Sequence, residues 1–129
     1  MSTDLKMLAW TAGLTLVLWL PYILARMMQE GIIPTVSYMA DTKALPLWAE
    51  RAKKAHYNAV ENLVPFAAVV IVAHLTQTAN GTTAAASVTY FWARVAHYVG
   101  YISGLPFVRT LTFAIGWIAT LVIFLVIVS

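Results

Sequence analysis

Residues 50–75 read ERAKKAHYNAVENLVPFAAVVIVAHL, a charged half that runs directly into an apolar half. The charged half contains four polar side chains spaced 3, 4 and 3 residues apart: Arg51, Lys54, Asn58 and Glu61. On a helix with 3.6 residues per turn, this spacing places all four on one face. A charged side chain at the centre of a bilayer costs about 2.5 to 3.5 kcal/mol, so this face must meet protein or a watery cavity rather than lipid.

The composition of the whole chain indicates a membrane protein. Hydrophobic residues make up 61% of the 129 positions and charged residues 10%, whereas an average soluble domain is about 25% charged. Two charge-free runs, residues 7–25 and 110–129, are 19 and 20 residues long, enough to cross a hydrocarbon core about 30 Å thick. The first run is too long for the apolar part of a signal peptide, so we expect a retained first helix.

Without cysteine, the chain has no disulfide, thiolate metal site or thiol nucleophile of its own.

Turn-forming residues divide the chain into helices. Gly31 and Pro34, Asn80-Gly81, and Gly104 with Pro106 separate the apolar stretches. We therefore expect a single domain, 1–129, with helices at about 5–28, 46–76, 83–102 and 107–128. The predicted fold is an all-α integral membrane protein, a bundle of four transmembrane helices.

The basic residues predict the orientation of this bundle. Five of the eight Lys and Arg residues lie between Arg26 and Lys54, and Arg109 lies in the other connection on the same side. The positive-inside rule places both connections in the cytoplasm, and both termini on the opposite side. Because the basic residues flank apolar spans and form no patch with aromatic partners, we expect no nucleic acid partner.

The third helix carries a second polar stripe, formed by Tyr90, Arg94, His97, Tyr98 and Tyr101. Arg94 lies eight residues, or about 12 Å, from the cytoplasmic end, at a depth comparable with Glu61. Two readings remain open: an ion pair between Glu61 and Arg94 that holds the helices together, or a cationic, partly acidic cavity for a ligand. Such a cavity suits a small anion, because Arg and Lys bind carboxylates while Glu61 can receive an ammonium. No pair of histidines has ligand-like spacing with a carboxylate, so no metal is expected.

Two motifs resemble those of a known family. The pattern Glu50-Arg51-x-x-Lys54-Ala55-His56-x-Asn58-x-x-Glu61, followed by Pro65-Phe66, resembles the signature of the MAPEG family, the membrane-associated proteins of eicosanoid and glutathione metabolism. The stretch Arg94-Val95-Ala96-His97-x-x-x-Tyr101 resembles the second block of that family. The resemblance implies a homotrimer with glutathione as co-substrate at each subunit interface, and a lipophilic electrophile that arrives through the membrane lipid.

The resemblance also implies roles for individual residues. The glutathione-binding positions would be Arg51, Lys54, Asn58, Glu61, Arg94, His97 and Tyr101, with Arg26 from the neighbouring subunit. Arg109 would be catalytic, because a positive group near the sulfur lowers the thiol pKa and a helix N-terminus favours an anion. Lys54 stands where several eicosanoid enzymes have arginine, so a bidentate grip on a carboxylate would become a point charge. Phe113 stands where some relatives have tyrosine, and Thr110 where a serine can occur. These differences argue against a dedicated prostaglandin synthase.

The leading hypothesis is a membrane-bound glutathione transferase or peroxidase that acts on hydrophobic electrophiles. A bacterial inner membrane is favoured over an organelle membrane by the compact length. The alternative is a non-catalytic relative that binds a thiol or a lipid. A proton-coupled four-helix exporter is disfavoured because residues 7–25 contain no acid, and intramembrane carboxylates mark proton coupling.

Overall fold

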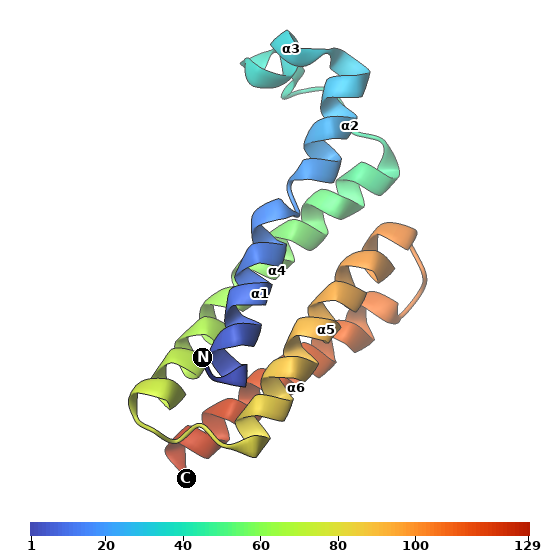
Figure 1. The fold of residues 1–129 in the computed structure, drawn as a ribbon. Helices are drawn as coiled ribbons and strands as arrows, with labels where there is room; N and C mark the ends of the chain where they lie inside the picture. The colour runs from blue at the N-terminus through green and yellow to red at the C-terminus, as the bar shows by residue number, and fades with distance from the viewer.

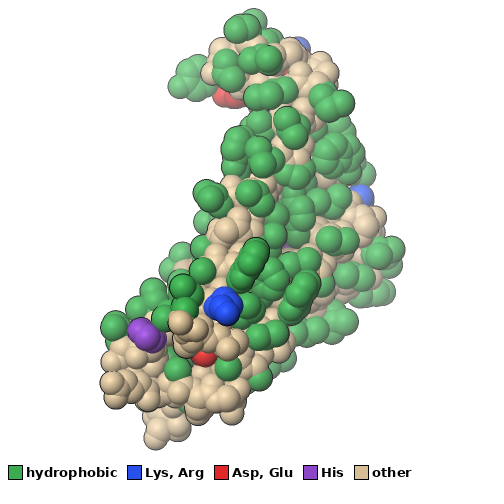
Figure 2. Space-filling model, viewed as in Figure 1, with side chains coloured by type: hydrophobic (Ala, Val, Ile, Leu, Met, Phe, Trp, Pro, Cys, Tyr) green, Lys and Arg blue, Asp and Glu red, His purple; other side chains and the backbone are tan.

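The computed structural model describes all 129 residues, and its secondary structure is entirely helical. The helices, drawn in Figure 1, are α1 (Thr3–Val17), α2 (Leu20–Glu30), α3 (Ile32–Val36), a 3-10 turn (Tyr38–Ala40), α4 (Leu47–Leu75), α5 (Gly81–Ser103) and α6 (Val108–Val128). Three stretches are long and apolar enough to cross a membrane, namely Thr3–Glu30, Leu47–Leu75 and Val108–Val128. The surface agrees with this, since hydrophobic side chains cover most of the face shown in Figure 2.

The helix expected over residues 5–28 is interrupted at Leu18 and Trp19, which separate α1 from α2. Pro21 explains the break, because it has no N–H to donate to the preceding turn. A neighbouring helix compensates in part: the Tyr98 hydroxyl of α5 donates to the Leu18 carbonyl oxygen at 3.2 Å. A polar side chain from a neighbour is one of the ways in which membrane helices tolerate proline.

α4 is a single helix of 29 residues that continues through Pro65. At 1.5 Å per residue it is about 44 Å long, well beyond the hydrocarbon thickness. Its charged first half therefore extends to the membrane interface, beside α2. Small residues, Ala49, Ala52 and Ala55, are fully buried there and let the neighbouring helices approach closely.

The connection between α4 and α5 is tight. Asn80 caps α5 by accepting hydrogen bonds from the backbone of Thr82 and Thr83, and the Thr83 hydroxyl completes a reciprocal capping box with the Asn80 backbone. Such caps supply partners for N–H groups that a helix start leaves free. α5 then runs back antiparallel to α4, as the Asn-Gly pair predicts.

α5 and α6 form a close hairpin through residues 104–107. Gly104 ends α5 with a left-handed backbone, φ 71°, and Phe107 precedes α6 with φ 70°. Gly100 lies directly against the Val108 side chain, so even a methyl group would collide there. In Figure 1, both termini and the α4–α5 connection lie at one end of the bundle, and α2 and α3 extend beyond the α5–α6 connection at the other.

The core between α4, α5 and α6 is aromatic at its centre. Phe66 of α4 stacks on Tyr90 of α5, with ring centroids 3.8 Å apart and planes 8° apart. Gly116 of α6 also lies beside Tyr90, where an added Cβ would make ordinary van der Waals contact with the ring at 3.6 Å. This packing fixes α5 in the interior, so the polar residues on the same face of α5 are buried as well.

Candidate functional site

The centre of the site is a hydrogen bond between α4 and α5. Arg94 is 3% exposed, and its Nη2 donates to Asn58 Oδ1 at 2.7 Å. The Arg94 stem packs near Gly116 of α6. Arg94 therefore bonds to Asn58 rather than pairing with Glu61, which is exposed. A charge-assisted hydrogen bond to a neutral amide leaves the positive charge of Arg94 uncancelled.

In the structure, the four polar residues expected on one face of α4 divide into two pairs, and only Arg51 lines the cavity described below. At 100° per residue, Arg51 and Asn58 point within about 20° of each other, as do Lys54 and Glu61, and the two pairs diverge by about 60°. The first pair is half-buried against α5, and Lys54 and Glu61 face outward and are exposed. Within one chain, the second pair belongs to the outer surface of α4.

The C-terminal half of α5 links this pair of helices to α6. His97 is 2% exposed and meets the Tyr101 ring edge-on, with centroids 5.6 Å apart at 74°. The Arg109 guanidinium carbon lies 5.0 Å from the centre of the same Tyr101 ring, within range for a cation–π interaction. Tyr101 thus holds the Arg109 guanidinium beside α5.

A cavity of about 390 Å³ opens between α4 and the α5–α6 turn. Its polar side chains are those of Arg51, Tyr101, Arg109 and Thr110, and the remaining lining residues are Gly100, Gly104, Leu105, Pro106 and Phe107. No acidic residue is among them. Two guanidinium groups from different helices that face one cavity without a carboxylate make a site for an anion.

Several buried polar atoms near the site have no protein partner. They are the Nε of Arg94, the Nδ1 of His97, the hydroxyl of Tyr90 and the hydroxyl of Ser87, all on α5. Buried polar atoms are nearly always hydrogen-bonded in native proteins. Ser87, Tyr90, Arg94 and His97 follow one another at intervals of three and four residues, so these atoms lie along one face of α5.

Arg26 lies away from this cavity. Its Nη1 donates to the Lys43 carbonyl oxygen, and Gln29 donates to the Ala44 carbonyl oxygen at 2.8 Å. Both bonds fasten the segment after α3 to α2. Within one chain, Arg26 thus stabilises the connection between α2 and α4.

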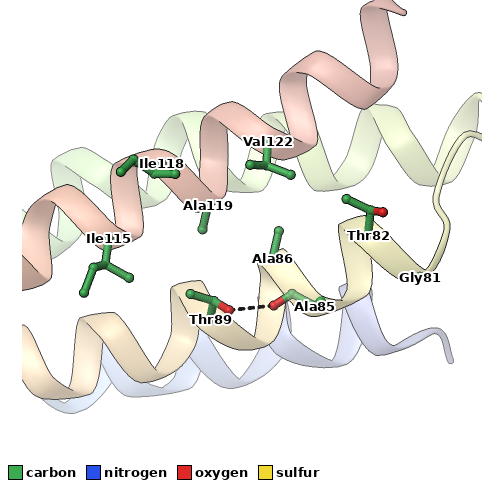
Figure 3. Close-up of a pocket in the computed structure, with 9 residues that line it drawn as sticks. All are labelled: Gly81, Thr82, Ala85, Ala86, Thr89, Ile115, Ile118, Ala119 and Val122. Atoms are coloured by element: carbon green, nitrogen blue, oxygen red, sulfur yellow. Dashed lines mark hydrogen bonds between the residues drawn. The ribbon is translucent and has the colours of Figure 1, made fainter.

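A second hollow, of about 520 Å³, runs between α5 and α6 on the outside of the bundle. Figure 3 shows its lining of small residues on α5 facing Ile115, Ile118 and Val122 of α6. It contains no charged residue, and the Thr89 hydroxyl already donates to the Ala85 carbonyl oxygen at 2.8 Å. The hollow is lined mainly by apolar side chains, and the hydroxyls of Thr82 and Thr89 are its only polar side-chain groups.

Some residues of the site escape sequence reasoning. Gly100 and Gly104 line the cavity and Gly116 contacts Arg94, yet a glycine in a sequence says only that the backbone is free to turn or approach closely. Another link joins His56 of the first motif to Tyr22 of α2, which lies outside the motifs, with Tyr22 Oη 2.9 Å from His56 Nδ1. The spacing of His56 within the charged stretch gave no sign of a tyrosine partner from α2.

Fold and site together define an α-helical membrane protein with a cationic cavity at one end of the bundle. A family model, that of the MAPEG family, matches residues 7–129, nearly the whole chain, and the protein belongs to this family. Comparison with curated proteins and with solved structures found no match. Family membership supports a membrane protein of glutathione or eicosanoid metabolism, in a family that includes glutathione transferases and other enzymes.

Proposed function

We propose that this protein is a membrane-bound glutathione transferase or peroxidase that conjugates or reduces hydrophobic electrophiles with the glutathione thiolate. The observation that carries the proposal is the cavity that Arg51 and Arg109 face without any acidic residue in its lining. Glutathione has two carboxylates and reacts as a thiolate, so two cations at one cavity suit it. Membership of a family that includes glutathione transferases supports the same chemistry.

The binding residues divide by charge. Arg51 would grip a carboxylate with paired hydrogen bonds, and Lys54 would add a point charge. Glu61, exposed on α4, would receive the ammonium of the γ-glutamyl group. Arg94 and His97 retain free nitrogen atoms, Nε and Nδ1, that would hydrogen-bond to ligand or water deeper in the bundle.

Arg109 is the proposed catalytic residue. It lies in the first turn of α6, where the helix dipole also favours an anion, and Tyr101 holds its guanidinium by its ring face. A glutathione thiol beside this charge has a lowered pKa and is therefore present as the thiolate at neutral pH. It would attack an electrophilic carbon, forming the S–C bond as the leaving group departs with the bonding electrons. With a hydroperoxide, the sulfur would attack the terminal oxygen, forming an S–O bond as the O–O bond breaks and the alcohol leaves. The glutathione sulfenic acid would then react with the thiol of a second glutathione to give the disulfide and water.

The assembly and membrane position belong to the same proposal. We infer that α5 crosses the membrane too, because the spans α4 and α6 are joined to its two ends by the short connections 76–80 and 104–107. Lys54 and Glu61 face outward on α4. In a homotrimer, this outer face would meet a neighbouring subunit. Glutathione bound at that interface would then contact Lys54 and Glu61 of one subunit and Arg26 of the other. The cavity would then face the cytoplasm and both termini the opposite side, with a bacterial inner membrane favoured.

Turnover of a chromogenic electrophile with glutathione tests the proposal. In purified protein in detergent, we expect Arg109→Ala to lower kcat/KM about 100-fold, the typical effect of removing one group that stabilises a developing anion. The matched control is Lys6→Ala, which removes an exposed cation at the opposite end of the chain and should leave turnover unchanged. Equal loss in both variants would refute the role of Arg109. Glutathione binding without any turnover would favour the non-catalytic alternative.

A further inference from the structure

The Arg51 guanidinium rests against the backbone of the glycine that ends α5. Gly104 has φ 71° and ψ 17°, and its N–H donates to the Tyr101 carbonyl oxygen. The last carbonyl groups of a helix carry a partial negative charge, which attracts a cation. Arg51 begins on α4, four residues after its first residue Leu47, and so reaches across the cavity to the end of α5.

Only glycine leaves space for this contact. A Cβ at position 104 would lie 2.5 Å from Nη1, 2.8 Å from Cζ and 3.2 Å from Nη2 of Arg51. The first two separations are far below van der Waals contact, so the two groups cannot occupy these positions together. The guanidinium is the end of a flexible side chain, so it would move while the backbone stayed in place. The position of the Arg51 charge in the cavity thus depends on the missing side chain at Gly104.

We propose that Gly104 is a positioning residue: it seats the Arg51 guanidinium at the C-terminal end of α5, so that Arg51 and Arg109 face the cavity together and bind one anionic ligand. The inference rests on the proposed function in taking glutathione as that ligand. Gly104 itself contacts no reacting atom, and its effect passes entirely through Arg51. Affinity for the anionic thiol should change much more than the rate of the chemical step.

The first experiment needs no ligand. Phenylglyoxal modifies exposed guanidinium groups, and mass spectrometry of the intact protein in detergent gives the modification rate of each arginine. We expect Arg51 to react several-fold faster in Gly104→Ala and in Gly104→Asn than in the wild type, with the rate at Arg26 unchanged as an internal reference. Asn tolerates a left-handed backbone, so an effect shared by both variants comes from the added side chain rather than from strain. An unchanged modification rate at Arg51 in both variants would overturn the proposal that Gly104 positions the Arg51 guanidinium.

The second experiment is a double-mutant cycle on glutathione affinity, measured by calorimetry. We expect Gly104→Ala to weaken binding about 10-fold, the scale of one charged hydrogen bond, while kcat at saturation changes less than twofold. In the Arg51→Gln background, the same substitution should have no further effect. A glycine that served only to terminate α5 would lower affinity in both backgrounds, and that result would overturn the proposal.

Gly31→Ala is the matched control for backbone strain. Gly31 also has a positive φ, 86°, but a Cβ there would meet only Pro34 Cδ at 3.8 Å, an ordinary contact. The Gly31→Ala substitution should therefore leave both the Arg51 modification rate and the glutathione affinity unchanged. If the wild type binds no glutathione, the proposed function fails, and the phenylglyoxal rates still decide the role of Gly104. If the wild type binds glutathione and Gly104→Ala binds it equally well, only the role of Gly104 fails.

Discussion

The hydrogen bond between Asn58 and Arg94 should be a main stabilising contact between α4 and α5. Asn58→Ala removes the acceptor 2.7 Å from Nη2 of Arg94, and Arg94, 3% exposed, would keep a buried charge whose Nε already lacks a partner. A hydrogen bond to a charged group contributes about 1.5 to 3 kcal/mol. We therefore expect Asn58→Ala to lower the free energy of unfolding by about 2 to 3 kcal/mol.

Reversible unfolding in mixed micelles of mild detergent and dodecyl sulfate, followed by helical circular dichroism, measures this difference. Asn62→Ala is the matched control, since Asn62 is one turn further along α4 and donates mainly to the Asn58 backbone carbonyl oxygen at 2.8 Å. Asn62→Ala should lower the free energy of unfolding by less than about 1 kcal/mol, the net value of a neutral hydrogen bond. The double variant Asn58→Leu/Arg94→Met should recover most of the loss, because replacing both polar partners removes the buried charge. Equal costs for Asn58→Ala and Asn62→Ala, or no recovery in the double variant, would refute the reasoning.

Two further predictions concern the packing that supports the site. Tyr98→Phe leaves the Leu18 carbonyl oxygen without the donor seen at 3.2 Å, and should cost about 1 kcal/mol of unfolding free energy in the same micelle assay; no measurable loss would show that water replaces the hydroxyl at no cost. Gly100→Ala should destabilise the α5–α6 hairpin by about 1 to 3 kcal/mol, the usual cost of overpacking, because the added methyl group meets the Val108 side chain. Gly116→Ala is its control, since its nearest contacts would be 3.6 to 3.7 Å, and a cost as large as that of Gly100→Ala would contradict the packing described here.

Much of the fold follows from the sequence, because a chain in lipid must satisfy its backbone hydrogen bonds within helices. Charge-free runs of spanning length and the Asn80-Gly81 pair therefore predict helices and a turn that the structure contains. The break between α1 and α2 was not predicted. Pro21 shows that a donor is missing, but whether the helix continues depends on a neighbour, here Tyr98, whose position comes only from tertiary packing.

The candidate site was predicted less completely. Spacing along α4 places Arg51, Lys54, Asn58 and Glu61 in one stripe. In a single chain, Arg51 and Asn58 are half-buried, whereas Lys54 and Glu61 face outward. A stripe drawn at intervals of three and four residues is wide enough to meet two different neighbours. The sequence could not decide the hydrogen-bond partner of Arg94 either, because Asn58 and Glu61 lie within one turn of each other on α4. Contacts that depend on an absent side chain, as at Gly104, have no signature in a single sequence.

The central claim is that the cationic cavity binds glutathione and holds it as the thiolate. The most direct test is titration of the purified protein with glutathione by calorimetry, with the ultraviolet absorbance of the thiolate followed as pH is raised. We expect saturable binding and a bound thiol whose pKa lies below its ordinary value. We also expect Arg109→Ala to return that pKa to its ordinary value while leaving some binding. Absence of saturable binding, or a bound thiol whose pKa is the same with and without Arg109, would contradict the central claim.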